Sequence, residues 1–354
     1  MSGDNIDQLM DEIKHKNTGF MHSVQAMREC LQKVDKEYEE RVKCIKEFLK
    51  NLQERISGIE DESDERLVKE LIDFLRQEEY GLEVLLAVSG LSKERLLRII
   101  SMIRIAFKSG IYQRYKEQYA EDWLDRDDWR RRRDREVFSE WKESKIKQMI
   151  RDDESFAKSI VLILLGRNEF VNRVLGRFER PLRVSLSKLK MDNEDIWDTL
   201  IRSSLYGSYS ARRGQCPEDL IKEIVREKLR LTYEGGKVEN IDRKIDVIIP
   251  SKKNPKIFIQ IAYVETTSSG MGDKAKAEKD TVRKAIKENY PDATFILFVD
   301  GLGWLSREEA LRMMCEAGDR VFTFHPEHIE KFVELLSELK QKYNLQSQTS
   351  LTEY

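Results

Sequence analysis

The hydrophobic and polar positions along the chain divide it into two regions with different periodicity. In roughly the first 200 residues, apolar side chains recur at steps of three and four, the spacing of one helix face. From about residue 215 onward, short apolar runs alternate with helical patterns, which is typical of a sheet covered by helices. The pattern predicts an α+β protein with an all-helical domain over residues 1–205, an α/β domain over 206–345 and a polar tail at 346–354.

The first 60 residues carry the clearest helical repeat. Apolar positions run from Ile6 through Leu31 to Ile59 in steps of three and four, over several heptads. The repeat predicts either an intermolecular coiled coil or two long helices folded into a bundle, with a possible break at Gly19. The helical domain that contains this coiled-coil-like segment is expected to serve DNA binding, dimerisation or both.

Residues 82–104 have the layout of a helix-turn-helix. A first helix ends at Gly90, and a second helix, capped by Ser92, exposes Lys93 and Arg95. The second helix of such a motif can enter a DNA major groove, so both cations are DNA-binding candidates. The alternative interpretation is an ordinary helix-loop-helix.

The α/β region shows a clear order of elements. A loop is expected over 206–214, and Pro217 is expected to begin a helix, because proline favours the first helical turn. Two apolar runs then predict a hairpin around a lysine-rich turn. The expected elements from there are strands at 243–250 and 256–264, a helix at 273–289, a strand at 294–299, a helix at 306–317, a strand at 321–324 and a helix from Pro326. Together they predict a mixed central sheet.

Each strand of the hairpin carries one polar residue in an apolar setting, Asp246 on the first and Gln260 on the second. An acidic residue on one strand facing a second acidic residue on its partner is a common way for nucleases to hold Mg²⁺. Asp246 and Gln260 are therefore candidate metal ligands, although an amide is a neutral and weaker ligand. The alternative for Gln260 is an edge-strand position that faces solvent.

The segment that follows the hairpin is rich in Ser, Thr and Gly and opens a helix with lysines in its first turns. Backbone N–H groups at a helix N-terminus and small hydroxyl side chains suit a phosphodiester. Lys274 is the candidate catalytic lysine of this helix. The DNA-binding candidates of the region are Ser268, Ser269 and Lys276, together with Arg212 and Arg213 in the expected basic loop.

The order helix, hairpin, helix, strand, helix, strand, helix resembles the core of PD-(D/E)XK nucleases. Over about residues 240–335, the Ser/Gly/Lys loop and the D-G-x-G-W turn at Asp300–Trp304 resemble type II restriction endonucleases of the DpnII/MboI kind. The resemblance implies Mg²⁺-dependent hydrolysis of double-stranded DNA at a short symmetric site by a homodimer. It also implies Asp246 as the metal carboxylate and position 260 as the second ligand.

The chain departs from that nuclease pattern at three places. Ala262 stands where the superfamily has its lysine, so Lys274 is expected to contribute from the loop. Gln260 stands where the superfamily has glutamate, which indicates either an inactivated form or a natural nuclease whose further ligand comes from elsewhere. Glu265 is the candidate displaced carboxylate if the chain turns there, and Glu218 is the candidate helical carboxylate.

Several other conspicuous residues are predicted to have structural roles. Asp300 is expected to fix the D-G-x-G-W turn and Trp304 to pack beneath it, whereas Gly235-Gly236 is expected to form a turn. His325 and His328, at the start of the last helix, show no metal-ligand spacing, so a capping or surface role is expected.

Composition restricts the possible functions. Charged residues make up 36% of the 354 residues, yet the formal net charge is -2, so any DNA-binding surface must be local. The four scattered cysteines indicate reduced structural thiols and a cytoplasmic protein. No apolar run is long enough to span a membrane, and the polar N-terminus is not a signal peptide.

Two other hypotheses fit the same residues. One is a non-catalytic DNA-binding protein that retains the nuclease fold with Gln260 as its natural residue. The other is a coiled-coil interaction protein whose α/β domain has another task, which predicts no salt-dependent DNA affinity.

Overall fold

A computed structural model describes residues 3–19, 22–108, 143–176, 184–266 and 270–346. The chain forms two compact units, one made of Met1–Val34 with Ala211–Tyr354 and the other of Asp35–Ser210. The DNA-binding candidates Ser268 and Ser269 and nearly all of the expected tail lie outside the described residues. Both units are α-helical in large part, and one contains a mixed sheet, so the predicted α+β class is confirmed.

The division into units differs from the expected boundary at residues 205 and 206 because the first helix belongs with the sheet. Helix α1 (Gly3–His15) packs against α15 (Glu308–Ala317). Its apolar face is buried in the same hydrophobic core as the central strands. That face consists of Ile6, Met10 and Ile13. The chain then turns at Gly19 with φ +47, at the predicted break.

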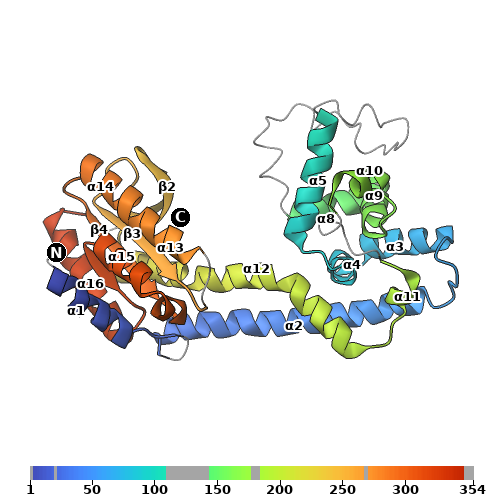
Figure 1. Cartoon of the computed structure of the whole chain (residues 1–354), viewed down its shortest axis with the longest axis horizontal. Helices are drawn as coiled ribbons and strands as arrows, with labels where there is room; N and C mark the ends of the chain where they lie inside the picture. The colour runs from blue at the N-terminus through green and yellow to red at the C-terminus, as the bar shows by residue number, and fades with distance from the viewer. Residues whose placement is uncertain (1–2, 20–21, 109–142, 177–183, 267–269, 347–354) are drawn as a thin grey trace, which may run out of the picture. The chain divides into compact units, whose positions relative to one another are not determined.

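Helices α2 (Gln25–Arg55) and α12 (Glu194–Glu223) lie side by side within the chain (Figure 1). The rings of Tyr38 and Tyr209 meet edge to face, with centroids 5.1 Å apart. Arg202 donates two hydrogen bonds to the Glu39 carboxylate, at 2.7 and 2.8 Å. The long helix of the N-terminal repeat, α2, therefore packs against α12 of the same chain, whereas the predicted bundle would have paired it with the first helix, which packs against α15.

Helix α12 corrects two sequence predictions. It runs without interruption through the expected loop at 206–214, and Pro217 lies inside it rather than at its start. Proline removes one backbone hydrogen bond from a helix, but burial of Tyr209 and Cys216 on the same helix offsets that loss. Cys216 also forms a disulfide with Cys30 of α2, which corrects the prediction that all four thiols are reduced.

The spacing of the cysteines could not have revealed that bond, because the two residues are separated by 186 positions in the sequence. Helix packing brings their Cα atoms to 5.9 Å, within the range that a disulfide requires. The two other cysteines, Cys44 and Cys315, are free thiols.

The unit formed by Asp35–Ser210 is built from helices over its described residues. Besides parts of α2 and α12 it contains α3 (Glu65–Gln77), α4 (Gly81–Ser89), α5 (Lys93–Lys108), α8 (Glu143–Asp152), α9 (Glu154–Leu164), α10 (Glu169–Val174) and α11 (Leu186–Leu189). Gly90 ends α4 in the left-handed region with φ 65, and the Ser92 hydroxyl accepts a hydrogen bond from the Arg95 amide. Helices α4 and α5 are thus joined by a short turn at Gly90. Their use as a DNA-binding helix-turn-helix, with DNA reading by Lys93 and Arg95, stays a prediction.

The sheet of the other unit has the strand order β1-β2-β3-β4-β5. The first three strands, β1 (Glu234–Val238), β2 (Ile241–Ile249) and β3 (Ile257–Tyr263), pair antiparallel. The last two, β4 (Thr294–Asp300) and β5 (Arg320–Phe322), continue in parallel with β3. The mixed sheet and the predicted strands are confirmed, whereas β1 replaces the turn expected at Gly235-Gly236.

Helices cover this sheet (Figure 1). A continuous helical segment follows β3 and consists of α13 (Met271–Ala277), the π-helical turn η4 (Glu278–Arg283) and α14 (Lys284–Asn289). It shares a hydrophobic core with α15, α1 and strand residues such as Phe258 and Leu297. Helix α16 (Pro326–Lys342) packs on the sheet through Phe332, whose ring lies 4.8 Å from that of Phe298. No helix of the described residues is both long and apolar enough to cross a membrane.

The D-G-x-G-W turn has the structural role that the sequence predicted. The buried Asp300 carboxylate accepts hydrogen bonds from the Thr18 amide and hydroxyl and from the amides of Gly301 and Phe324. Trp304 is fully buried, and its indole Nε1–H donates to the Ala262 carbonyl at 2.8 Å. The turn therefore braces the end of β3, the strand that carries Gln260.

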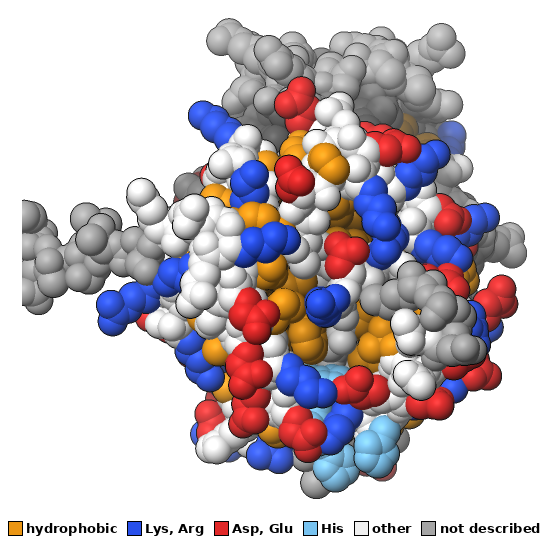
Figure 2. Space-filling view, turned by 90° about the vertical axis from the view of Figure 1, so that its left-hand side faces the viewer, with side chains coloured by type: hydrophobic (Ala, Val, Ile, Leu, Met, Phe, Trp, Pro, Cys, Tyr) orange, Lys and Arg blue, Asp and Glu red, His pale blue; other side chains and the backbone are white. Residues whose placement is uncertain are grey.

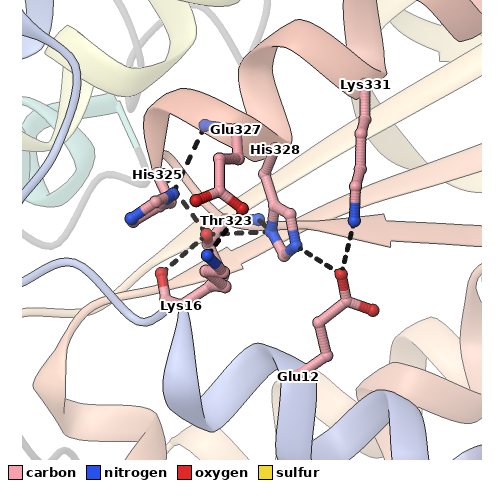
Figure 3. Close-up of polar contacts among 7 residues, drawn as sticks. All are labelled: Glu12, Lys16, Thr323, His325, Glu327, His328 and Lys331. Atoms are coloured by element: carbon pink, nitrogen blue, oxygen red, sulfur yellow. Dashed lines mark hydrogen bonds and ion pairs between the residues drawn. The ribbon is translucent and has the colours of Figure 1, made fainter.

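The two histidines near the start of α16 have structural roles (Figure 3), but only His325 has the predicted one, because His328 neither caps the helix nor lies at the surface. His325 caps the helix, and its ring accepts from the Glu327 amide. His328 is buried; its Nδ1 accepts from the Thr323 amide at 3.0 Å, and its Nε2 lies 3.0 Å from Glu12 of α1. Since Nδ1 is an acceptor, we assign the ring proton to Nε2, which donates to Glu12.

Candidate functional site

Asp246 and Gln260 lie next to each other on paired strands. The register of β2 and β3 pairs Val247 with Ile259, and one further step places Asp246 beside Gln260. Asp246 Oδ2 accepts a hydrogen bond from the Ile261 amide at 2.7 Å. The Asp246 side chain thus occupies the place that a backbone carbonyl of β2 would have in a regular strand pair. Gln260 is only 9% exposed and lies on the same face of β3 as Phe258 and Ala262, which belong to the core. The alternative of a solvent-facing edge position is therefore wrong for Gln260.

An irregularity in β1 and β2 accompanies Asp246. Their register shifts between Glu234 and Gly236, opposite the part of β2 that contains Asp246. Gly236 has φ +120, and a Cβ on Gly235 would lie 2.8 Å from the Asp246 carbonyl oxygen. The two glycines therefore permit a β-bulge at this point, and bulges commonly redirect a side chain beside a functional site.

A lysine and a glutamate from the helical segment after β3 complete the group. Lys274 Nζ donates to the Ile261 carbonyl at 3.3 Å, which places this helix face over the end of β3. Glu278 lies four residues later, on the same helix face. It is 3% exposed, and its Oε1 lies 3.6 Å from Arg243 of β2.

Burial dominates the electrostatics of these residues. Desolvation raises the pKa of Asp246 to about 6, although the Ile261 amide opposes the shift. Desolvation also raises the pKa of Glu278, and the charge of Asp246 adds to that shift. The pKa of Lys274 is lowered by burial, while the charges of Glu278 and Asp246 work against this. Asp246, Lys274 and Glu278 thus interact electrostatically in a partly dehydrated environment.

Glu218, the predicted helical carboxylate, also affects this group. Its charge contributes to the raised pKa of Asp246, so the two carboxylates interact electrostatically. Glu218 is half-buried and pairs with Lys222, one turn along α12, at 3.0 Å. It also accepts from Gln215 at 3.0 Å, so it already has two partners.

Glu265, the predicted displaced carboxylate, is held in a different pair. It is exposed, beyond the end of β3, and its Oε1 lies 2.7 Å from Arg213 of α12. Glu265 and Arg213 therefore bind each other rather than Asp246. Arg212 and Lys276 are exposed on α12 and α13, where contact with DNA stays a prediction.

The residues present fit a cation that prefers oxygen ligands. Across the described ranges, no group of three or more His, Cys, Asp or Glu side chains is placed to hold a metal ion. However, Gln260 Oε1 and Glu278 Oε2 are buried oxygens without a hydrogen-bond partner. Such orphaned acceptors are costly, and Mg²⁺ is bound by carboxylate and amide oxygens. Asp246, Gln260 and Glu278 are thus the residues that could hold such an ion.

Sequence reasoning missed Glu278 because it lies in the middle of a helix, outside every motif. One signal could have found it, since Glu278 follows the candidate Lys274 by four residues. Residues at that spacing share one helix face, so a lysine that reaches the site predicts that its neighbour does too.

Charges on the surface of this unit are mixed. Figure 2 shows one side of the molecule, where Lys and Arg side chains alternate with Asp and Glu over most of the drawn surface. This agrees with the net charge of -2 and with the prediction that any DNA-binding surface is local.

Comparison with known proteins identifies one related domain. Residues 199–340 match the family model of the BanI C-terminal domain. The matched stretch includes the whole sheet and the group around Asp246. That domain defines a family of restriction endonucleases. The similarity therefore supports the interpretation of this chain as a type II restriction enzyme that cleaves DNA at specific sites. Searches of curated proteins and of solved structures found no match to the chain.

Proposed function

We propose that this chain is a Mg²⁺-dependent type II restriction endonuclease that hydrolyses double-stranded DNA at a short specific site. The observation that carries the proposal is the meeting of Asp246, Gln260 and Lys274 on the paired strands β2 and β3 of a mixed sheet and the helix that follows them. This group lies within the stretch similar to the BanI C-terminal domain. The arrangement of the strands and of this group also supports a relationship to PD-(D/E)XK nucleases.

In this proposal Asp246 and Gln260 hold the metal ion. When bound, Mg²⁺ polarises the scissile phosphate and lowers the pKa of a coordinated water. The Ile261 amide donates to one Asp246 oxygen and keeps the carboxylate oriented, which leaves the other oxygen for the ion. The turn at Asp300–Trp304 holds the end of β3, and with it the position of Gln260.

Lys274 has the role of the lysine that Ala262 does not supply. An ammonium group has three donors, and the Ile261 carbonyl accepts from one of them. Another can donate to the attacking water or to a phosphate oxygen and orient it in line with the scissile bond. Two cuts across a two-fold symmetric site need two such groups, so we propose that the active form is a homodimer.

Plasmid cleavage in Mg²⁺ tests the proposal. Discrete fragments are expected, and they should disappear with Asp246→Asn but persist with Asp242→Asn, an exposed control on the same strand. If only a Gln260→Glu variant cuts, the chain is an inactivated nuclease. Salt-dependent DNA binding without cleavage by either form would replace the proposal with the non-catalytic DNA-binding hypothesis. Absence of both binding and cleavage would leave the interaction-protein hypothesis.

A further inference from the structure

We infer that Glu278 supplies the second carboxylate of a divalent-cation site, in place of the carboxylate that position 260 lacks. The inference rests on the proposed function for the role of the cation. It makes a distinct claim about the ligands, namely that an acidic side chain from the helix and a neutral amide from the strand bind one ion together with Asp246.

The position of Glu278 is fixed from two directions. Lys274, one helical turn earlier, bonds the Ile261 carbonyl at the end of β3. Arg243, three residues before Asp246 on β2, lies 3.6 Å from Glu278 Oε1. Glu278 therefore lies over β2 and β3, the two strands that carry Asp246 and Gln260. The π-helical turn η4 begins at Glu278, and such turns often occur at functional sites.

Two unsatisfied oxygens point to a missing ligand. Glu278 is 3% exposed and Gln260 is 9% exposed, and each has one buried oxygen without a hydrogen-bond partner. A buried acceptor without a donor is unfavourable, and a buried carboxylate oxygen especially so. A hard cation that prefers oxygen ligands, such as Mg²⁺ or Mn²⁺, would satisfy both atoms at once.

The charges explain why an amide is suitable at position 260. Asp246 and Glu278 are two acidic groups, and Lys274 and Arg243 are two basic groups that interact with them. The group is therefore balanced before a cation binds. A glutamate at position 260 would add a third carboxylate to a buried location, where uncompensated like charges are costly.

Mn²⁺ binding to the full-length protein tests the inference without relying on catalysis. Free Mn²⁺ is measured by electron paramagnetic resonance in solutions of the parent, of Glu278→Gln and of a control variant. The control is Glu334→Gln, which changes an exposed glutamate on α16. Glu278→Gln should weaken Mn²⁺ binding by at least about tenfold, since even outer partners of metal ligands are worth about 10–100-fold. The control should bind as the parent does.

A relocation variant makes the test specific to the carboxylate. Glu278→Gln combined with Gln260→Glu moves the acid from the helix back to the strand, and it should restore most of the Mn²⁺ affinity. Parent-like Mn²⁺ binding by Glu278→Gln alone would overturn the inference. So would a double variant that binds no better than Glu278→Gln while its thermal unfolding matches that of the parent.

DNA cleavage by the same variants separates this inference from the proposed function. Mn²⁺ binding that depends on Glu278, in a protein that cuts no DNA, would support the ligand set and refute the nuclease. Mg²⁺-dependent cleavage that survives Glu278→Gln would support the nuclease and overturn the role of Glu278. If the nuclease proposal and the role of Glu278 are both correct, the parent cuts DNA, Glu278→Gln does not, and the relocation variant regains cleavage.

Discussion

The Asp300 network allows a stability prediction whose size follows from the structure. Its Oδ1 accepts from the Thr18 and Gly301 amides at 2.8 and 2.6 Å. Its Oδ2 accepts from the Thr18 hydroxyl and the Phe324 amide, both at 2.7 Å. Asp300→Ala leaves three backbone donors without an acceptor. At about 1–3 kcal/mol for each buried orphan, the variant should lose roughly 3–9 kcal/mol. That is a large share of the roughly 5–15 kcal/mol of a whole domain.

Asp300→Asn refines the argument because it keeps the shape and changes one oxygen to an amide nitrogen. Each Asp300 oxygen accepts from at least one backbone amide, so in either orientation an N–H donor faces the new NH₂ group. The Asn variant should therefore lose about 1–3 kcal/mol or more of unfolding free energy, and its stability should lie between those of the parent and Asp300→Ala.

Denaturant unfolding of the full-length chain measures these losses. Hydrogen exchange at the Thr18 and Phe324 amides reports the local opening. Asp292→Ala removes an exposed carboxylate and should change stability by less than about 0.5 kcal/mol. A loss below about 1 kcal/mol for Asp300→Ala, with unchanged exchange at both amides, would refute the reasoning.

Two further predictions concern other links in the same unit. Cys30→Ser should lower the free energy of unfolding by about 2–4 kcal/mol under non-reducing conditions, because the disulfide joins residues 186 positions apart. The control variant Cys44→Ser, at a free thiol, should not lower it. In the presence of a dithiol reductant, the difference between Cys30→Ser and the parent should vanish. The pKa of His328 is lowered chiefly by burial, so the folded state favours the neutral ring and stability should fall as pH drops below about 6.5. Acidic groups with raised pKa values, such as Asp246, change the pH dependence of stability in the opposite direction. The measurement is therefore the difference in the free energy of unfolding between the parent and His328→Asn, from pH 7.5 to 5.5. Parallel curves of unfolding free energy against pH would contradict the prediction.

The fold was predictable wherever a local pattern decides local structure. Short apolar runs located β2, β3 and β4, and the Ser92 cap located the start of α5. The predictions failed where distant residues decide the outcome. Pro217 sits inside a helix because Cys216 and Tyr209 are buried against a helix far away in the sequence. Gly235-Gly236 forms part of β1 because β2 pairs with it through a bulge. Neither partner is visible in a local window.

The candidate site shows the same limit at the level of single side chains. Sequence spacing identified Asp246, Gln260 and Lys274, and the structure brings these three together. It also directed the search for a missing carboxylate to Glu265, the next acidic residue along the chain, which pairs with Arg213 instead. The better candidate, Glu278, lies 18 positions after Gln260 in sequence but on the helix that covers the same two strands.

A sequence motif can miss a metal ligand such as the one proposed at Glu278, because a metal ion requires oxygen atoms at particular points in space and not at particular positions in the sequence. A strand side chain and a side chain from the helix packed above it can reach the same point, because helix and strand lie against each other. A motif search therefore interprets Gln260 as a lost ligand, whereas the structure places Glu278, with its unsatisfied oxygen, on the helix that covers the same strands. If Glu278 is the second carboxylate, an amide at the strand position is compatible with activity, and Gln260 is the residue of a working site and not of an inactivated one.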